Sequence, residues 1–274
     1  MPYRLFCDQY KRSKQKSLRW TKQKLLVLTY LSLLSSQNVF GTTLILASDV
    51  WCPYVCDKAP ESPGFIVEVA QQVFAQQGYQ VKYQNLNWAR AIQEARVGHI
   101  HGILGAFRGD APDFIFPEQP IAVISSYFFT LKDNPWHYSG LESLAQIKVG
   151  AIVDYDYGDQ ALNRYLQRYK FTYKVNLLSG NNLPLARGIR MVLNKRLDAF
   201  IETPPVFWYT SKTMGLAHHF KAAGPVHNQE NMYIAFSPAH PLSEKYAQIL
   251  NQGITRLKQS GEFQRLQQKY QLVL

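Results

Sequence analysis

Charged side chains stand at the ends of several predicted strands, where they can reach a bound small molecule. Arg108 follows the strand predicted at 100–104, and its planar guanidinium can donate two parallel hydrogen bonds to a carboxylate. Glu202 ends a later predicted strand. A buried carboxylate there needs a hydrogen-bonded partner, or it can act as a general acid whose pKa is raised by burial. These positions predict either recognition of a charged group or proton transfer.

Aromatic residues accompany these charges near the same strand ends. Trp51 follows the first predicted strand, and Phe65 opens the helix after it. Trp88 starts a second helix, with Arg90 two residues later, and Phe107 follows the third strand. Flat rings supply an apolar wall for a small molecule. Each ring can instead belong to the core, and Arg90 can instead hold its own loop.

Further candidates lie in the second half of the chain. Tyr155, Asp156 and Tyr157 precede a predicted helix, and Thr203 follows a later strand. A helix N-terminus offers free N–H groups and the positive end of a dipole, which favour an anion. The alternative is that Asp156 and Asp159 cap this helix themselves.

The elements that would position these residues alternate regularly. A strand begins at Leu44, a helix ends at Gly78, and two further strands at 81–86 and 100–104 flank a second helix. This βαβαβ order predicts a parallel sheet with right-handed crossovers. Open α/β sheets bind small ligands at the carboxyl ends of their strands, so the candidates above are expected to meet at one edge.

The alternation restarts near Lys148, and the chain closes with helices from 242 to 270 that are interrupted near Gly261. Two units of similar plan, joined by extended segments, predict two lobes with two chain crossings. The expected division is 42–130 with 225–274 for lobe 1, and 131–224 for lobe 2.

Residues 1–41 have the pattern of a secretory signal peptide. Eight basic residues and one acid precede an apolar run at 25–34, which is about half the ~20 residues needed to cross a bilayer. Cleavage is predicted after Gly41. An uncleaved membrane anchor is the alternative.

Removal of the leader changes the charge and cysteine arguments. It takes away eight of 30 basic and one of 19 acidic residues, which leaves 233 residues with a net charge of +4. Without a clustered basic face, a nucleic-acid partner is not expected. Cys52 and Cys56 are then the remaining cysteines, and an even pair in an exported protein predicts a disulfide. Free thiols are the alternative.

Metal and cofactor sites are not expected. His99 and His101 alternate on one strand without a third ligand nearby, so they are interpreted as structural. The sequence has no phosphate loop, no G-x-S-x-G and no dinucleotide fingerprint.

Short motifs follow one another over residues 43–274: Trp51-Cys52-Pro53-Tyr54, Gly64-Phe65-Ile66-Val67-Glu68, Asn87-Trp88-Ala89-Arg90, Asp113-Phe114-Ile115-Phe116, Lys148-Val149-Gly150, Leu197-Asp198-Ala199-Phe200 and Ser260-Gly261-Glu262-Phe263. Their order and spacing resemble the type II periplasmic solute-binding proteins. The greatest similarity is to the polar amino-acid-binding group, bacterial solute-binding protein family 3.

This resemblance implies an α/β fold of two lobes that close over one small polar solute, with a hinge of two crossing strands. Trp51 lies where similar proteins stack an aromatic ring on the ligand. The carboxylate-binding Arg of amino-acid binders usually lies beyond the position of Arg108, so Arg108 either replaces it or lies on the surface. The family's ammonium-binding Asp matches Thr203 or, shifted by one residue, Glu202.

The sequence therefore predicts a periplasmic substrate-binding protein of an ABC-type importer, without enzymatic activity, cofactor or metal. Its expected partners are a small polar solute, which an amino acid would satisfy, and an inner-membrane ABC permease, and the protein is expected to be a monomer. Two alternatives stay open. One is a dehydratase-like lyase on the same fold with Glu202 as its acid, and the other is a ligand sensor for a membrane receptor.

Overall fold

A computed structural model describes residues 42–57, 61–180, 183–226 and 229–272. The predicted signal peptide, residues 1–41, lies outside the described residues. None of the helices in the described part has the length and hydropathy needed to cross a membrane.

The first sheet contains five strands, in the order β2-β1-β3-β10-β4. β1 is parallel to β2 and β3, while β10 is antiparallel to β3 and β4. The strands are β1 (Thr42–Ser48), β2 (Tyr79–Asn85), β3 (Gly102–Ala106), β4 (Ala122–Ile124) and β10 (Glu230–Phe236). The predicted parallel βαβαβ unit is thus present, and it ends at a single edge formed by Ser48, Asn85 and Ala106.

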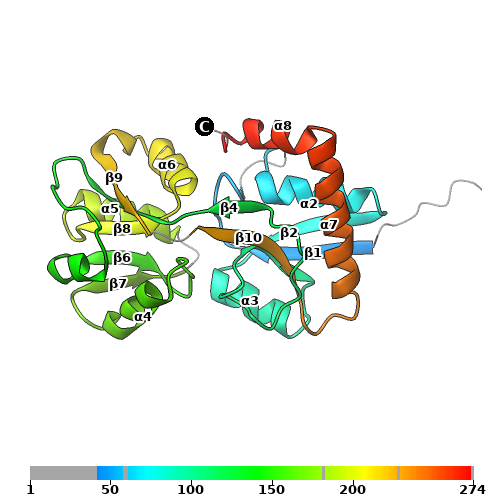
Figure 1. Ribbon diagram of the computed structural model, residues 1–274, viewed down its shortest axis with the longest axis horizontal. Coiled ribbons are helices and arrows are strands. Elements are labelled where there is room, and N and C mark those ends of the chain that lie inside the picture. Colours follow the sequence, from blue (N-terminus) through cyan, green and yellow to red (C-terminus); the bar gives the residue numbers. More distant parts are fainter. Residues whose placement is uncertain (1–41, 58–60, 181–182, 227–228, 273–274) are drawn as a thin grey trace, which may run out of the picture. The chain divides into compact units, whose positions relative to one another are not determined.

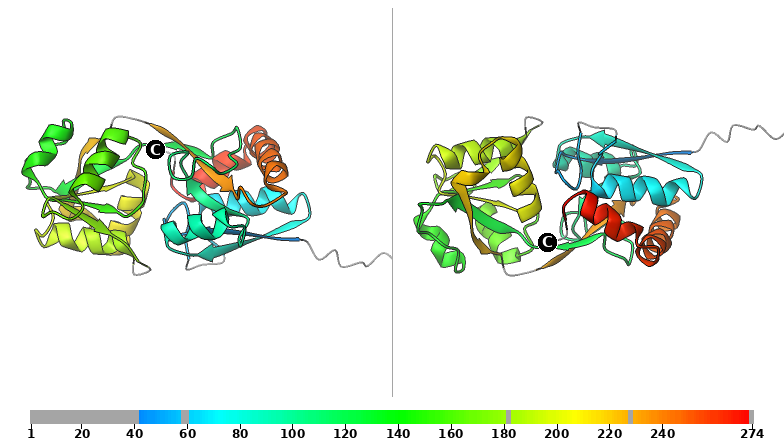
Figure 2. Two further views of the ribbon diagram at one scale, coloured as in Figure 1. Left: turned by 90° about the horizontal axis from the view of Figure 1, so that it is seen from below. Right: turned by 90° about the horizontal axis from the view of Figure 1, so that it is seen from above.

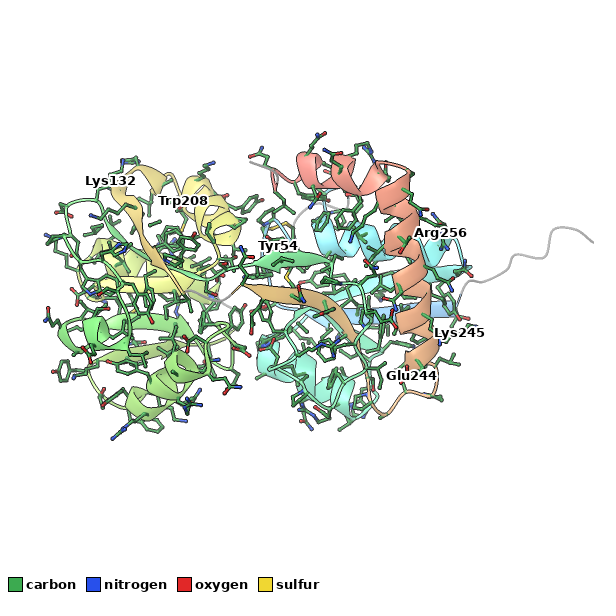
Figure 3. All side chains as sticks on the ribbon, viewed as in Figure 1. Tyr54, Lys132, Trp208, Glu244, Lys245 and Arg256 are labelled. Carbon is green, nitrogen blue, oxygen red and sulfur yellow. A yellow bond between two sulfur atoms is a disulfide. The ribbon has the colours of Figure 1, made fainter. Side chains whose placement is uncertain are left out.

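Helices cover both faces of this sheet. Leu44 and Leu46 face the core that contains α2 (Phe65–Ala75), whereas Ala47 contacts the cluster that contains α3 (Trp88–Arg96). This follows from the alternation of side chains along β1. α7 (Ser243–Gln259) packs on α2 and α8 (Glu262–Lys269), which gather on the same side in Figure 1. Figure 3 shows the charged residues Glu244, Lys245 and Arg256 along α7, and all three are exposed.

The second sheet also contains five strands, in the order β7-β6-β8-β5-β9. β6 is parallel to β7 and β8, and β5 is antiparallel to β8 and β9. The strands are β5 (Tyr127–Leu131), β6 (Val149–Ile152), β7 (Val175–Leu178), β8 (Ala199–Glu202) and β9 (Phe220–Pro225). The second sheet therefore repeats the plan of the first.

Helices also cover this sheet on both faces. Leu162 of α4 (Gln160–Tyr169) packs in one cluster with Val149, while Ile189 of α5 (Pro184–Leu193) packs in another with Phe200. The remaining helical elements are α6 (Pro204–Thr213) and the 3₁₀ turns η1 (Leu141–Gln146) and η2 (Ala217–His219).

The first sheet and its helices form lobe 1, and the second sheet and its helices form lobe 2. The chain passes from lobe 1 to lobe 2 between β4 and β5, and it returns between β9 and β10. β4 pairs antiparallel with β10 in the first sheet, and β5 pairs antiparallel with β9 in the second. Figure 2 shows β4 and β10 side by side where the chain passes between the lobes. The two-lobe α/β architecture expected from the sequence is confirmed.

The exact lobe boundaries stay a prediction. The pairing pattern places all of Tyr127–Leu131 in the second sheet, so the passage between the sheets begins a few residues before the expected boundary at 130. The reason is local: only two residues separate β4 from β5, although these strands belong to different sheets.

Candidate functional site

A small cavity lies at the carboxyl edge of the first sheet and is closed by residues of lobe 2. Its volume is about 20 Å³, which is room for about one water molecule. Lobe 1 supplies most of the lining and lobe 2 supplies two residues. The lining residues are Ser48, Asp49, Trp51, Trp88, Leu104, Gly105, Phe107, Asp110, Tyr155 and Asp156.

The loop after β1 holds Trp51 in place. A disulfide joins Cys52 and Cys56 with an S–S distance of 2.06 Å, as the sequence predicted. Trp51 and Val55 form a β-bridge across this short loop. The ring of Tyr54, labelled in Figure 3, stacks on Trp51 with 4.8 Å between centroids. Trp51 is therefore held in place by its own loop, and it lines the cavity.

The second aromatic wall combines residues of both lobes. Trp88 begins α3, whose N-terminus is capped by Asn87 through a 2.9 Å hydrogen bond from the backbone N–H of Arg90. The ring of Tyr155, from lobe 2, meets Trp88 edge to face at 6.2 Å. This geometry is typical of favourable aromatic pairs, so it helps to hold the lobes together.

Three hydrogen bonds connect the lobes at the cavity, and each uses a carboxylate as acceptor. The Tyr155 hydroxyl donates to Asp49 at 2.6 Å. The indole N–H of Trp51 donates to Glu202 at 3.1 Å. The third bond runs from the backbone N–H of Asp156 in lobe 2 to Asp110 in lobe 1, at 3.1 Å.

Gly109 lies close to Asp156 of the other lobe. A Cβ atom added at this position would collide with the carboxylate of Asp156. Any larger residue at this position would therefore displace the Asp156 carboxylate, which lies directly against the Gly109 backbone.

Burial raises the pKa of the acids at this junction. The pKa of Glu202, whose side chain is almost fully buried, rises to about 7. The pKa of Asp49 rises to about 6 and that of Asp110 to about 8, again chiefly through burial, with the neighbouring Asp156 adding to the effect on Asp110. Desolvation disfavours the charged form of a carboxyl group, so closure of the lobes favours its protonation.

Comparison with known families shows which family the chain belongs to. The sequence model of the bacterial extracellular solute-binding proteins, family 3, matches residues 45–273. The chain belongs to this family. No curated protein sequence matches it.

Solved structures share the fold of this solute-binding protein. One, from work on glutathione import through GshT and the cystine importer TcyBC of Streptococcus mutans, is 20% identical, with a TM-score of 0.68 over 84% of this chain and 95% of that one. An ancestral amino acid-binding protein, a precursor of cyclohexadienyl dehydratase, is 18% identical (TM-score 0.64; 83% and 94% covered). A histidine kinase sensor domain with similarity to periplasmic binding proteins is 17% identical (TM-score 0.68; 83% and 95% covered). The predicted type II periplasmic binding protein-like fold is confirmed.

Five of the predicted ligand-binding residues meet at the cavity of this solute-binding protein: Trp51, Trp88, Phe107, Tyr155 and Asp156. Glu202 lies directly behind Trp51, to which it is hydrogen-bonded. For Asp156, the competing interpretation was helix capping. The structure gives that role to Asp159, which accepts hydrogen bonds from the N–H groups of Ala161 and Leu162.

The two predicted arginines lie elsewhere. Arg108 is exposed, and its guanidinium stands over the rings of Phe116 and Tyr233, 5.0 and 5.1 Å from their centroids. Arg90 is exposed and lies 3.5 Å from Glu94 on the same helix. Neither arginine is among the residues that line the cavity.

Three further predicted residues are buried next to the site or below it. Phe65 has no exposed surface and packs edge to face against Phe263. Tyr157 is buried, and its hydroxyl accepts a hydrogen bond from the N–H of Ile152 at 2.6 Å. Thr203 is buried and its backbone N–H donates to Glu202.

Sequence reasoning passed over Ser48, Asp49 and Asp110, all of which line the cavity. A usable signal was present, since Asp49 directly follows β1 and Asp110 closes the turn after β3. Asp110 accepts a 2.8 Å hydrogen bond from the N–H of Phe107, which turns its carboxylate back toward the sheet edge. Within the described residues, no group of three or more His, Cys, Asp or Glu side chains has an arrangement that could hold a metal ion.

Proposed function

We propose that this protein binds a small polar solute between its two lobes in the periplasm and delivers it to an inner-membrane ABC permease. The observation that carries the proposal is the cavity at the sheet edge, which both lobes line and whose polar groups bridge the lobes through three hydrogen bonds. The cavity holds about one water molecule. Solute entry therefore requires the lobes to separate, and a solute would replace the bridging bonds with its own.

Closure is then a population shift. A solute stabilises the closed form only by the difference between its affinities for the closed and open forms. Trp51 of lobe 1 offers an aromatic ring, and Tyr155 of lobe 2 offers a hydrogen-bonding hydroxyl. The two groups come together only when the lobes meet. The bound amino acid or other polar solute would be recognised by this combined surface.

A thermal-shift screen of amino acids, amines and small organic acids tests the proposal. At least one solute is expected to raise the melting temperature in a saturable way, and isothermal titration should give one site per chain. Trp51→Ala is expected to abolish the shift, while Tyr209→Ala, which removes an exposed aromatic ring on α6, should leave it unchanged. Equal binding by wild type and Trp51→Ala would argue against the site.

An enzyme on the same fold is the second candidate, favoured by one observation. Glu202 is buried, its pKa is raised to about 7, and its Oε2 atom has no hydrogen-bond partner. A carboxylic acid that stays protonated near neutral pH can serve as a general acid. Turnover of a prephenate-like acid that is lost in Glu202→Gln would establish the dehydratase-like activity. Binding without turnover would support the transport role.

The membrane protein that binds this chain would distinguish a role in transport from a role in sensing. Copurification of the solute-loaded protein with a permease and its ATPase is the outcome expected of an importer. Binding to a membrane receptor instead would make the protein a ligand sensor.

A further inference from the structure

The lining of the cavity is acidic and contains no basic side chain. Asp49, Asp110 and Asp156 line it, and the other lining residues are aromatic, apolar or serine. Glu202 adds a fourth carboxylate directly behind the Trp51 ring. Burial raises the pKa of Glu230, and the nearby carboxylate of Asp156 adds to this effect. The site thus concentrates carboxyl groups where a solute would bind.

These carboxylates have neutral partners. Among the residues that the structure describes, none of Asp49, Asp110, Asp156 and Glu202 takes part in an ion pair. Their hydrogen bonds come from backbone N–H groups, Asn163 and the side chains of the aromatic wall.

One acceptor at this junction is unused. Glu202 is 2% exposed, and its Oε2 atom has no hydrogen-bond partner. A buried acceptor without a donor is unfavourable, and Glu202 is connected to the cavity lining through its hydrogen bond with Trp51.

The cavity offers no arginine or lysine to bind a carboxylate of the solute. Arg108 is committed to the faces of Phe116 and Tyr233, and Arg90 lies beside Glu94. An α-amino acid would bring its own carboxylate among the acidic residues of the lining, and like charges brought together in a desolvated site cost several kcal/mol.

Building on the proposed function, we propose that the solute is an organic cation, an amine or guanidinium compound whose capture does not depend on a carboxylate. Its charge would neutralise the carboxylates of the lining, which are otherwise buried without a cation. Its apolar part would lie against Trp51, Trp88 and Tyr155, and aromatic faces also attract cations. The raised pKa values of Asp49, Asp110 and Glu202 agree with this. In the closed form without solute, protons neutralise these carboxylates, and in the complex the cation would neutralise them instead.

Matched pairs of probes test the proposal on the wild-type protein at pH 7.5. Agmatine and putrescine are compared by calorimetry with arginine and ornithine, the same cations that carry an α-carboxylate. Serine and glutamate represent neutral and anionic solutes. The amines are expected to bind about tenfold or more tightly than their amino acids.

A variant locates the interaction. Asp49→Asn keeps the size of the side chain and is expected to weaken binding of agmatine about 30-fold or more. Glu118→Gln, at an exposed position, is expected to bind agmatine as the wild type does. The comparison of amines with amino acids needs no variant, so it stands even if Asp49→Asn does not fold.

Several results would overturn the proposal. Tighter binding of an amino acid than of its amine would show that a carboxylate is recognised. Binding of serine or glutamate without binding of any amine would refute the cation, yet leave the proposed solute-binding function standing. Absence of binding by every probe would count against both.

Discussion

Glu202→Gln gives a direct measure of the electrostatic cost at the junction of the lobes. The pKa of Glu202 is about 7 in the folded protein, against an ordinary value of 4.5. Below pH 4.5 the carboxyl group is protonated in both folded and unfolded chains. Between pH 4.5 and 7 only the unfolded chain ionises, so rising pH favours unfolding, and above pH 7 the full loss is reached. The full difference corresponds to about 3 kcal/mol.

Glutamine occupies the same volume and keeps an oxygen that can accept the hydrogen bonds from Trp51 and Thr203, but it does not titrate. Between pH 5 and pH 8 the wild type is expected to lose about 2 to 3 kcal/mol relative to the variant. For a chain of this length, 1 kcal/mol moves the melting temperature by about 2–4 °C. The melting temperature of the variant should therefore gain roughly 5–10 °C on the wild type over this range.

Melting curves recorded by circular dichroism at pH 5, 6, 7 and 8 provide the measurement. Asp49 and Asp110 also titrate with raised pKa values, but they are present in both proteins, so the difference between the curves isolates Glu202. Glu118→Gln, with an exposed carboxyl group, is the control and should follow the wild type. If the melting temperatures of wild type and Glu202→Gln run parallel from pH 5 to 8, the carboxyl group is not buried as described and the reasoning fails.

Three further predictions follow from single contacts. Gly109→Ala should weaken closure of the lobes, because its methyl group displaces the Asp156 carboxylate from its hydrogen bonds with Gly158 and Asn163. Small-angle scattering should then show that solute reduces the radius of gyration less than in the wild type. Equal compaction of the two proteins would contradict the contact. Arg108→Ala should leave solute affinity within about twofold of the wild type, and the lost ring contacts should cost roughly 0.5–1 kcal/mol of stability. If Arg108 instead binds a carboxylate of the solute, calorimetry will show a large loss of affinity. Thiol titration of the unfolded, leader-free protein without reductant should find no free thiol, since Cys52 and Cys56 are bonded; two free thiols would refute the disulfide.

The fold was predictable because its signals are local. Apolar runs and helix stops gave the alternation of strands and helices, and Gly261 marks the break between α7 and α8. The pairing of β10 with β3, more than a hundred residues apart, was not predicted. Periodicity identifies an element and its buried face, but not the partner strand.

The site was predictable only in part, for a physical reason that Arg108 and Asp49 illustrate. Both follow a strand closely, so sequence position alone rates them as equal candidates. Burial separates them: Arg108 extends over two rings to the surface, while Asp49 accepts a hydrogen bond from Tyr155, 106 residues later in the chain. The sequence drew attention to the arginine because its fork suits a carboxylate. Long-range contacts instead bring the acids together at the cavity, and the proposal of a cationic solute starts from this arrangement.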